Sequence, residues 1–252
     1  MALVGFSGPR RLPVGQVQLF SAVVGSLLRA GRGIGVGCAA GADALVIAAT
    51  LAAGGAPSLS VFAAFGPEGQ GAGRSSALLP VWLAQRAGAS VSFFAGGESP
   101  PLLARLARRS QALVSAVSVS GLGCGFVGFP TRPCPSGVIP SQAWQSCGSG
   151  TWSTLLLAAG KGVSVVVVPV GWRWQPPAWP GRWEPAGRAW PWSAGWRWVP
   201  GPGALELAQR LGRREAEAQE RRQRQVRVQQ QKQPAAREVR ARRGGRRGRW
   251  VA

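Results

Sequence analysis

The sequence contains no histidine, tyrosine or asparagine, and Asp43 is its single aspartate. Without histidine, the chain has no imidazole for acid–base catalysis or for binding a metal. Its four cysteines form no C-x-x-C pair, which argues against a zinc site and favours small buried thiols. We therefore expect neither a metal nor a cofactor. The cysteines are Cys38, Cys124, Cys134 and Cys147.

Long uninterrupted apolar runs are also missing. Residues 155–170 are apolar, but they are too few to cross a bilayer and Lys161 interrupts them. The N-terminus begins with a strand-like run and lacks the basic and apolar regions of a secretory signal peptide. These features predict a soluble, cytoplasmic protein with no membrane span.

Negative charge is scarce, because 30 Lys and Arg residues stand against nine Asp and Glu residues, a net charge of +21. Residues 1–200 hold 15 basic and 4 acidic residues, a net +11, and residues 201–252 hold 15 and 5, a net +10. A chain this basic attracts polyanions, nucleic acid first and an anionic membrane surface second. GC-rich coding bias is an equal explanation for the scattered arginines, because only two of the 30 basic residues are lysines.

Apolar runs typical of buried strands alternate with segments of helical spacing along residues 1–170. This alternation, with strands apolar on both faces, predicts an α/β fold with an open parallel sheet covered by helices on both sides. Ligands of such sheets bind beyond the carboxyl ends of the strands. The expected strands are residues 2–7, 33–37, 59–65, 91–95, 125–130 and 163–170, and the expected helices are residues 14–30, 42–53, 76–87, 100–117 and 152–160.

Residues 171–203 differ in composition, with eight tryptophans separated by prolines and arginines. We expect this segment to be an irregular extension that packs on the domain, because large indoles usually act through burial. Stacking of the indoles on nucleobases is the alternative.

Residues 204–252 form a basic tail rich in Ala, Glu, Gln and Arg. With few large apolar residues, the tail is expected to be partly helical or disordered. Its RRGGRRGR run resembles segments that bind RNA or DNA without sequence preference.

The first glycine-rich junction between a strand and a helix contains Gly5, Ser7, Gly8 and Arg10. Glycines let backbone N–H groups approach a phosphate, and an arginine adds a charge-assisted hydrogen bond. A tight turn with a surface arginine is the alternative interpretation.

The second junction contains Gly37, Cys38, Gly41 and Asp43. An acidic residue at a helix start usually stabilises the positive end of the helix dipole. Because Asp43 is the only aspartate of the chain, a functional role is an equal alternative.

The third junction contains Gly148, Ser149, Gly150 and Thr151 and opens a helix. Successive small residues at a helix N-terminus form a concave arrangement of N–H groups that binds anions, and the two hydroxyls can add hydrogen bonds. This junction carries the clearest phosphate-binding pattern of the three.

Four motifs occur in an order that resembles the superfamily of the DNA-processing protein DprA (Smf) and the LOG nucleotide phosphoribohydrolases. They are GFSGPRR at residues 5–11, GCAAGADA at 37–44, ARLARRSQALVSAV at 104–117 and GSGTW at 148–152. The resemblance covers roughly residues 2–170 and implies a Rossmann-like fold with a phosphate site for a nucleotide or single-stranded DNA. It also implies that Arg108 or Arg109 corresponds to the helix arginine of LOG enzymes.

The chain departs from the LOG pattern PGGxGTxxE at one position. Thr154 stands where the resemblance places the catalytic glutamate. Cleavage of an N-glycosidic bond needs a carboxylate, and threonine cannot carry that charge. The departure argues for a phosphate cradle without hydrolase activity.

We therefore expect a non-catalytic protein that binds a nucleotide or single-stranded nucleic acid at the glycine-rich junctions. The alternative is a nucleoside-monophosphate phosphoribohydrolase, with Asp43 as the only carboxylate near the expected site. A third alternative is a membrane-surface or structural protein whose basicity reflects coding bias. A homodimer is left open as the assembly state.

Overall fold

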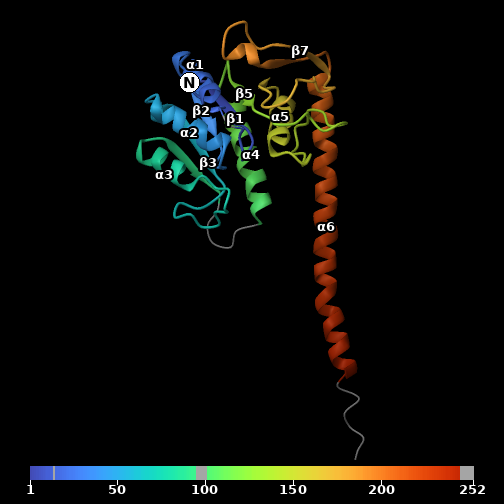
Figure 1. Ribbon diagram of the computed structural model, residues 1–252. Coiled ribbons are helices and arrows are strands. Elements are labelled where there is room, and N and C mark those ends of the chain that lie inside the picture. The colour runs from blue at the N-terminus through green and yellow to red at the C-terminus, as the bar shows by residue number, and fades with distance from the viewer. Residues whose placement is uncertain (14, 95–100, 245–252) are drawn as a thin grey trace, which may run out of the picture.

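The computed structural model describes residues 1–13, 15–94 and 101–244, with side chains up to residue 225 except residue 219. One eight-stranded sheet organises this part of the chain, in the order β4-β3-β2-β1-β5-β6-β8-β7 (Figure 1). Its first six strands are parallel. They are β1 (Leu3–Ser7), β2 (Gly33–Val36), β3 (Leu59–Ala63), β4 (Ser90–Phe93), β5 (Gly125–Gly128) and β6 (Ser164–Val167).

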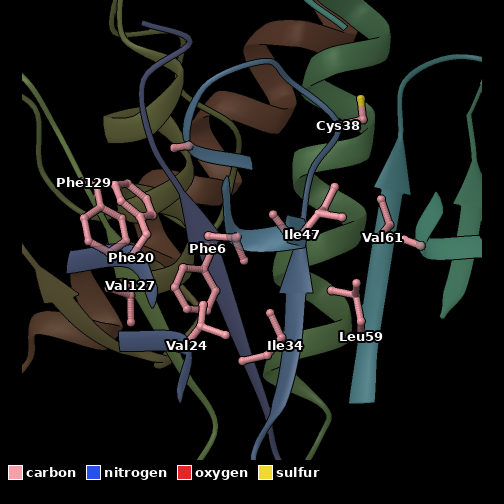
Figure 2. Packing of buried hydrophobic residues seen from close by; sticks show 14 of the residues in the cluster. Phe6, Phe20, Val24, Ile34, Cys38, Ile47, Leu59, Val61, Val127 and Phe129 are labelled. Carbon is pink, nitrogen blue, oxygen red and sulfur yellow. The ribbon is translucent and has the colours of Figure 1, made fainter. Parts of the chain in front are cut away.

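Helices cover both faces of the sheet, which confirms the predicted α/β, Rossmann-like architecture. The first three helices pack on one face around a core that includes Phe6, Phe20 and Ile47 (Figure 2). The next two pack on the opposite face around Leu113, Phe126 and Leu155. They are α1 (Val17–Arg29), α2 (Ala42–Ala52), α3 (Leu78–Arg86), α4 (Leu102–Ser118) and α5 (Gly150–Gly160), with a short 3-10 turn at Ala56–Ser58.

The strand order reverses between β1 and β5. From β1 the chain builds outward to β4, and then it crosses back to place β5 on the other side of β1. Ser7 at the end of β1 is in register with Gly128 at the end of β5, so both strands end at the same level. The loops after these strands diverge to opposite faces, which opens a crevice at this point of the sheet.

The expectation that residues 171–203 are irregular is wrong, because two antiparallel strands from this segment extend the sheet. They are β7 (Gly181–Pro185) and β8 (Trp196–Pro200), with a 3-10 turn at Trp192–Ala194 between them. In β8 the side chain of Trp198 is buried, whereas that of Arg197 before it is exposed, because neighbouring residues of a strand point to opposite faces.

Several indoles of this segment pack against one another and on the domain. Trp179 and Trp198 are buried, with their ring centroids 5.6 Å apart, and Trp179 also lies edge-on to Trp152 of α5. These two rings are therefore part of the buried core. Trp190 is an exception and is 60% exposed.

The helix α6 (Ala204–Gly244) begins where the expected tail begins. Of the two alternatives expected for the tail, partly helical or disordered, these residues adopt the helical one, because Ala, Glu, Gln and Arg have high helix propensity. Ala204 and Ala208 are buried against the domain, and further along the helix Glu220 forms an ion pair with Arg224. Beyond its first turns α6 extends away from the domain (Figure 1). The RRGGRRGR run continues past Gly244 and so lies largely outside the described residues.

Candidate functional site

A cleft of about 750 Å³ lies beyond the carboxyl ends of β1 and β5. Its walls come from the loop after β1, the loop after β5, one side of α4 and the N-terminus of α5. This is the position at which open α/β sheets bind ligands. Nine of the residues predicted from sequence line it, namely Ser7, Gly8, Arg10, Asp43, Arg109, Gly148, Ser149, Gly150 and Thr151.

The first junction contributes three of its four predicted residues to the cleft. Ser7, Gly8 and the exposed Arg10 line it. Gly8 is required for packing, because a Cβ atom there would collide with the Cβ of Ala42 in α2. Gly5 does not line the cleft, since it lies within β1 where a Cβ would meet the ring of Phe126. Its absent side chain makes room for an aromatic ring rather than for a phosphate.

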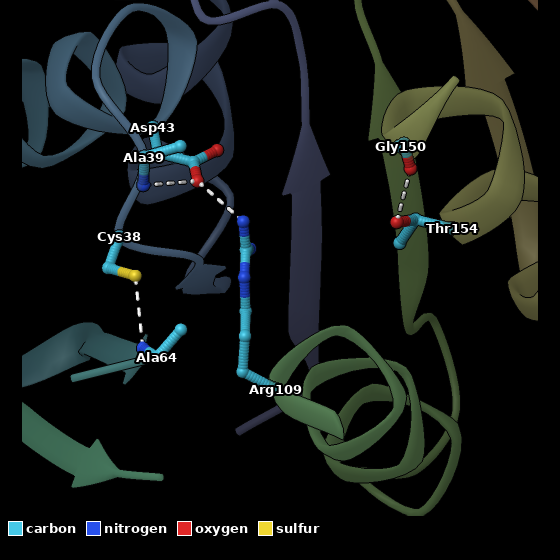
Figure 3. A network of polar contacts seen from close by, with 7 residues as sticks. All are labelled: Cys38, Ala39, Asp43, Ala64, Arg109, Gly150 and Thr154. Atoms are coloured by element: carbon cyan, nitrogen blue, oxygen red, sulfur yellow. Dashed lines mark hydrogen bonds and ion pairs between the residues drawn. The ribbon is translucent and has the colours of Figure 1, made fainter. Parts of the chain in front are cut away.

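The second junction is organised around Asp43, which is only 4% exposed. One carboxylate oxygen, Oδ2, accepts hydrogen bonds from the backbone N–H of Ala39 at 3.0 Å and from Nη2 of Arg109 at 3.3 Å (Figure 3). Gly37 makes this pair possible, because a Cβ at residue 37 would collide with the Arg109 guanidinium and approach Oδ2 of Asp43. Asp43 and Gly37 thus fix the arginine of α4 at the cleft wall.

Gly41 and Cys38 are packed against other parts of the protein and do not line the cleft. Gly41 has φ of +80°, and a Cβ there would lie 2.5 Å from the carbonyl oxygens of Pro9 and Arg10. The Cys38 Sγ accepts a hydrogen bond from the N–H of Ala64 at 3.1 Å and is buried (Figure 3). The prediction that these two residues contact phosphate is therefore not supported by their position.

Burial governs protonation at this wall. It raises the pKa of the Asp43 carboxyl above its ordinary value, while Arg109 and the N–H of Ala39 oppose that rise. Burial likewise raises the pKa of the Cys38 thiol, against the opposing charge of Arg109. Neither group is arranged as a reactive nucleophile or a solvent-accessible base.

The helix α4 carries three neighbouring arginines in different environments. Arg109 lines the cleft and is 12% exposed, whereas Arg108 is exposed and lies outside the lining. Arg105, one turn before Arg109, is buried and donates to the carbonyls of Ala64 and Gly71 at 2.8 Å. Of the two predicted alternatives, Arg109 is therefore the cleft residue.

The third junction lies entirely at the cleft. Gly148 has φ of +77°, which turns the chain into α5. The Ser149 hydroxyl caps the helix by accepting from the N–H of Trp152 at 3.4 Å. A Cβ added at Gly150 would meet no heavy atom within 4 Å, so open space lies in front of this backbone. First-turn N–H groups have no intrahelical acceptor, so this end of α5 presents donors to an anion.

Thr154 lines the cleft, but its side chain is occupied. Its hydroxyl donates to the carbonyl oxygen of Gly150 at 2.8 Å, and the residue is 2% exposed (Figure 3). Among the described residues that line the cleft, Asp43 is the sole carboxylate, and it is paired with Arg109. The described walls therefore offer no free carboxylate that could activate water.

Several residues of the loop between β5 and α5 line the cleft although no sequence motif points to them. Arg132 is exposed at the cleft, and its carbonyl oxygen accepts from Nε1 of Trp152 at 3.0 Å. The signal for Arg132 is its position four residues after β5, which lies beside β1 in the sheet. With Arg10 and Arg109 it gives the lining three guanidinium groups against one carboxylate. The other missed residues include Ser110, Thr131, Trp144 and Ser146.

Two further features of the described residues concern a membrane span and a metal site. None of its helices combines the length and apolar character needed to cross a membrane. Within the same residues, Cys, Asp and Glu side chains gather nowhere in a group of three that could hold a metal ion.

No protein-family profile matches the chain, and no curated protein matches it in sequence. The chain is similar in structure to DNA processing protein A (DprA) from Streptococcus pneumoniae, with a TM-score of 0.47 and 18% identity over 66% of this chain and 49% of that one. It is also similar to the single-stranded DNA-binding DNA processing protein A from Helicobacter pylori, with a TM-score of 0.46 and 15% identity over 66% of this chain and 65% of that one. The chain thus spans about half of the first protein and just under two thirds of the second.

Proposed function

We propose that the cleft binds the phosphate backbone of a single-stranded nucleic acid without cleaving it. The observation that carries this proposal is the pairing of an open helix N-terminus at Gly148–Thr151 with three arginines in a cleft whose one carboxylate is buried and neutralised. Backbone N–H groups and guanidinium groups are the donors that bind phosphate oxygens.

The charge distribution favours a polymer over a single nucleotide. Residues 201–252, which include α6, carry a net charge of +10, and α6 begins beside the domain that holds the cleft. A mononucleotide fills the cleft alone, whereas a strand can leave it and continue along a basic surface. Binding of the strand should therefore release several counterions and weaken steeply with salt.

Fluorescence anisotropy with a labelled oligothymidylate, at several salt concentrations, tests this proposal on the full chain. We expect binding whose affinity falls log-linearly with salt, and weak competition by a nucleoside monophosphate. Absence of binding at low salt would exclude the proposal. Equal competition by the mononucleotide, mole for mole, would instead identify a small-nucleotide site.

The phosphoribohydrolase alternative makes an opposite prediction. Incubation of the full chain with nucleoside monophosphates should release no free base, because Thr154 donates to Gly150 and Asp43 is paired with Arg109. Release of base that disappears in Asp43→Asn would establish the hydrolase.

A further inference from the structure

The cleft has an aromatic wall that phosphate binding does not explain. Trp144 and Trp152 are the two aromatic residues among its described lining. Trp152 is 1% exposed, and its Nε1 donates to the carbonyl oxygen of Arg132, so it belongs to the core. Trp144 is only half-buried and precedes the glycine-rich loop by a few residues. Of the two indoles, Trp144 is the one with surface left to meet a ligand.

Hydrogen bonds to Glu215 of α6 hold the segment on both sides of Trp144. The Ser141 hydroxyl donates to Oε2 of Glu215 at 2.8 Å, and Nε2 of Gln145 donates to Oε1 at 2.7 Å. The Ser141 hydroxyl also accepts from the N–H of Ala143 at 3.2 Å. A half-buried carboxylate therefore fixes the chain before and after the indole.

The approach of α6 to this segment is close. The N–H of Gln142 donates to the carbonyl oxygen of Ala208 at 3.2 Å. A Cβ at Gly212 would lie 2.9 Å from the Cβ of Gln142, so the helix and the segment are in direct contact there. The beginning of α6 is thus part of the support of the cleft wall.

The chemistry of this wall suits a nucleobase. A fixed indole presents a flat aromatic surface on which any base can stack. Leu103 and Leu106 of α4, with Pro133 and Pro135, add apolar surface to the same cleft, while the glycine-rich loop and the arginines supply the polar donors. A nucleotide unit has this division into an apolar face and an anionic group.

We propose that Trp144 stacks on a base of the bound strand and that Glu215 is the positioning residue that holds Trp144 in place. This inference rests on the proposed function and specifies which part of the cleft meets the base. It makes α6 a structural contributor to recognition, in addition to any attraction that its positive charge exerts.

The test compares an oligothymidylate with an abasic oligonucleotide of equal length, which keeps the phosphates and lacks the bases. Trp144→Ala should weaken the oligothymidylate about tenfold and leave the abasic strand unchanged. Trp144→Phe should retain most of the affinity, because it keeps an aromatic face. Trp82→Ala, at an exposed indole outside the cleft, is the matched control and should change neither.

The two strands separate failure of this inference from failure of the proposed function. If the wild-type chain binds neither strand, both proposals fail. If it binds both strands, but Trp144→Ala weakens them equally or not at all, phosphate binding stands and base stacking by Trp144 is excluded.

The role of Glu215 has its own readout. Glu215→Ala should lower the ratio of oligothymidylate affinity to abasic affinity, and Glu215→Gln, which keeps a hydrogen-bonding group at this position, should restore part of it. Glu217→Ala, at an exposed residue on the same helix, is the control and should leave the ratio unchanged. An equal loss on both strands in Glu215→Ala, or no change in the ratio, would exclude the positioning role.

Discussion

The two walls of the cleft differ in whether their polar groups already have partners within the protein. On the wall formed by α2 and α4, Asp43 and Arg109 are largely buried, and they are paired with each other. On the wall formed by α5, Gly148 and Gly150 leave backbone donors facing open space. On the first wall the two charges pair with each other, and among the described side chains only the buried Nε of Arg109 lacks a hydrogen-bond partner there. On the second wall the backbone donors face open space.

The comparison separates stability from binding. Changes at the paired wall should act mainly on folding stability, because they leave a buried charge without its partner. Changes at the open wall should act mainly on affinity, because its groups gain little from the rest of the protein. The predictions below test this separation, in order of decreasing expected effect.

Asp43→Ala should cost about 3 kcal/mol of unfolding free energy, because it leaves the Arg109 guanidinium partly buried without its carboxylate. Urea denaturation followed by circular dichroism measures this. Asp43→Asn is the milder control, because its amide oxygen can still accept from the N–H of Ala39. A loss below about 0.5 kcal/mol in Asp43→Ala would remove the structural role of the pair.

Gly148→Ala and Gly150→Ala should differ although they lie two residues apart. Gly148 has φ of +77°, so alanine there should cost about 1 kcal/mol of stability and disturb the loop. Alanine at Gly150 meets open space, so stability should be unchanged while the methyl group obstructs the ligand. Thermal melting and oligonucleotide affinity, measured on both variants, give the comparison. Unchanged affinity in Gly150→Ala would place the ligand elsewhere.

Arg10→Ala and Arg132→Ala should each weaken strand binding and lower the slope of log affinity against log salt by about 1, because each removes one phosphate contact. Both side chains are exposed, so the melting temperature should stay constant. Arg108→Ala, on the exposed side of α4, is the matched control. An equal loss in the Arg108 variant would show that general positive charge, and not the cleft, drives binding.

The smallest effect concerns pH. Burial raises the pKa of Asp43 above its ordinary value of 3.8, so the folded chain holds this proton more strongly than the unfolded chain does. That stabilisation is complete below the ordinary pKa and is lost as pH rises through the folded-state pKa. Relative to Asp43→Asn, the wild-type unfolding free energy should therefore fall above about pH 4, by at most ~1.4 kcal/mol per pH unit. A difference that grows with pH would contradict this.

The parallel strands and the helices between them can be predicted from the local pattern of apolar residues. Buried parallel strands are apolar on both faces, so runs such as residues 163–170 are visible without any tertiary information. The junctions that reach the cleft were found in the same way, because the glycines at Gly148 and Gly150 stand between a strand and a helix. Asp43 stands out in the sequence as the only aspartate, and in the structure its carboxylate pairs with Arg109.

What the pattern missed depends on contacts between distant segments. The strands β7 and β8 become visible only through their pairing with β6, because their sequence is dominated by Trp, Arg and Pro. Arg132 and Trp144 reach the cleft because β5 lies beside β1 and because α6 supports the preceding loop. Gly5 and Cys38 look like phosphate-loop residues in sequence, but their neighbours in space are Phe126 and Ala64.

Hydrogen exchange of the full chain, with and without a single-stranded oligonucleotide, tests the central claim most directly, because it distinguishes the cleft from the basic helix. We predict that the strand slows exchange of the backbone amides of residues 146–152, where the glycine-rich loop opens α5. Protection confined to residues 206–244, with the loop after β5 and the start of α5 unchanged, would contradict the account and assign binding to α6 alone.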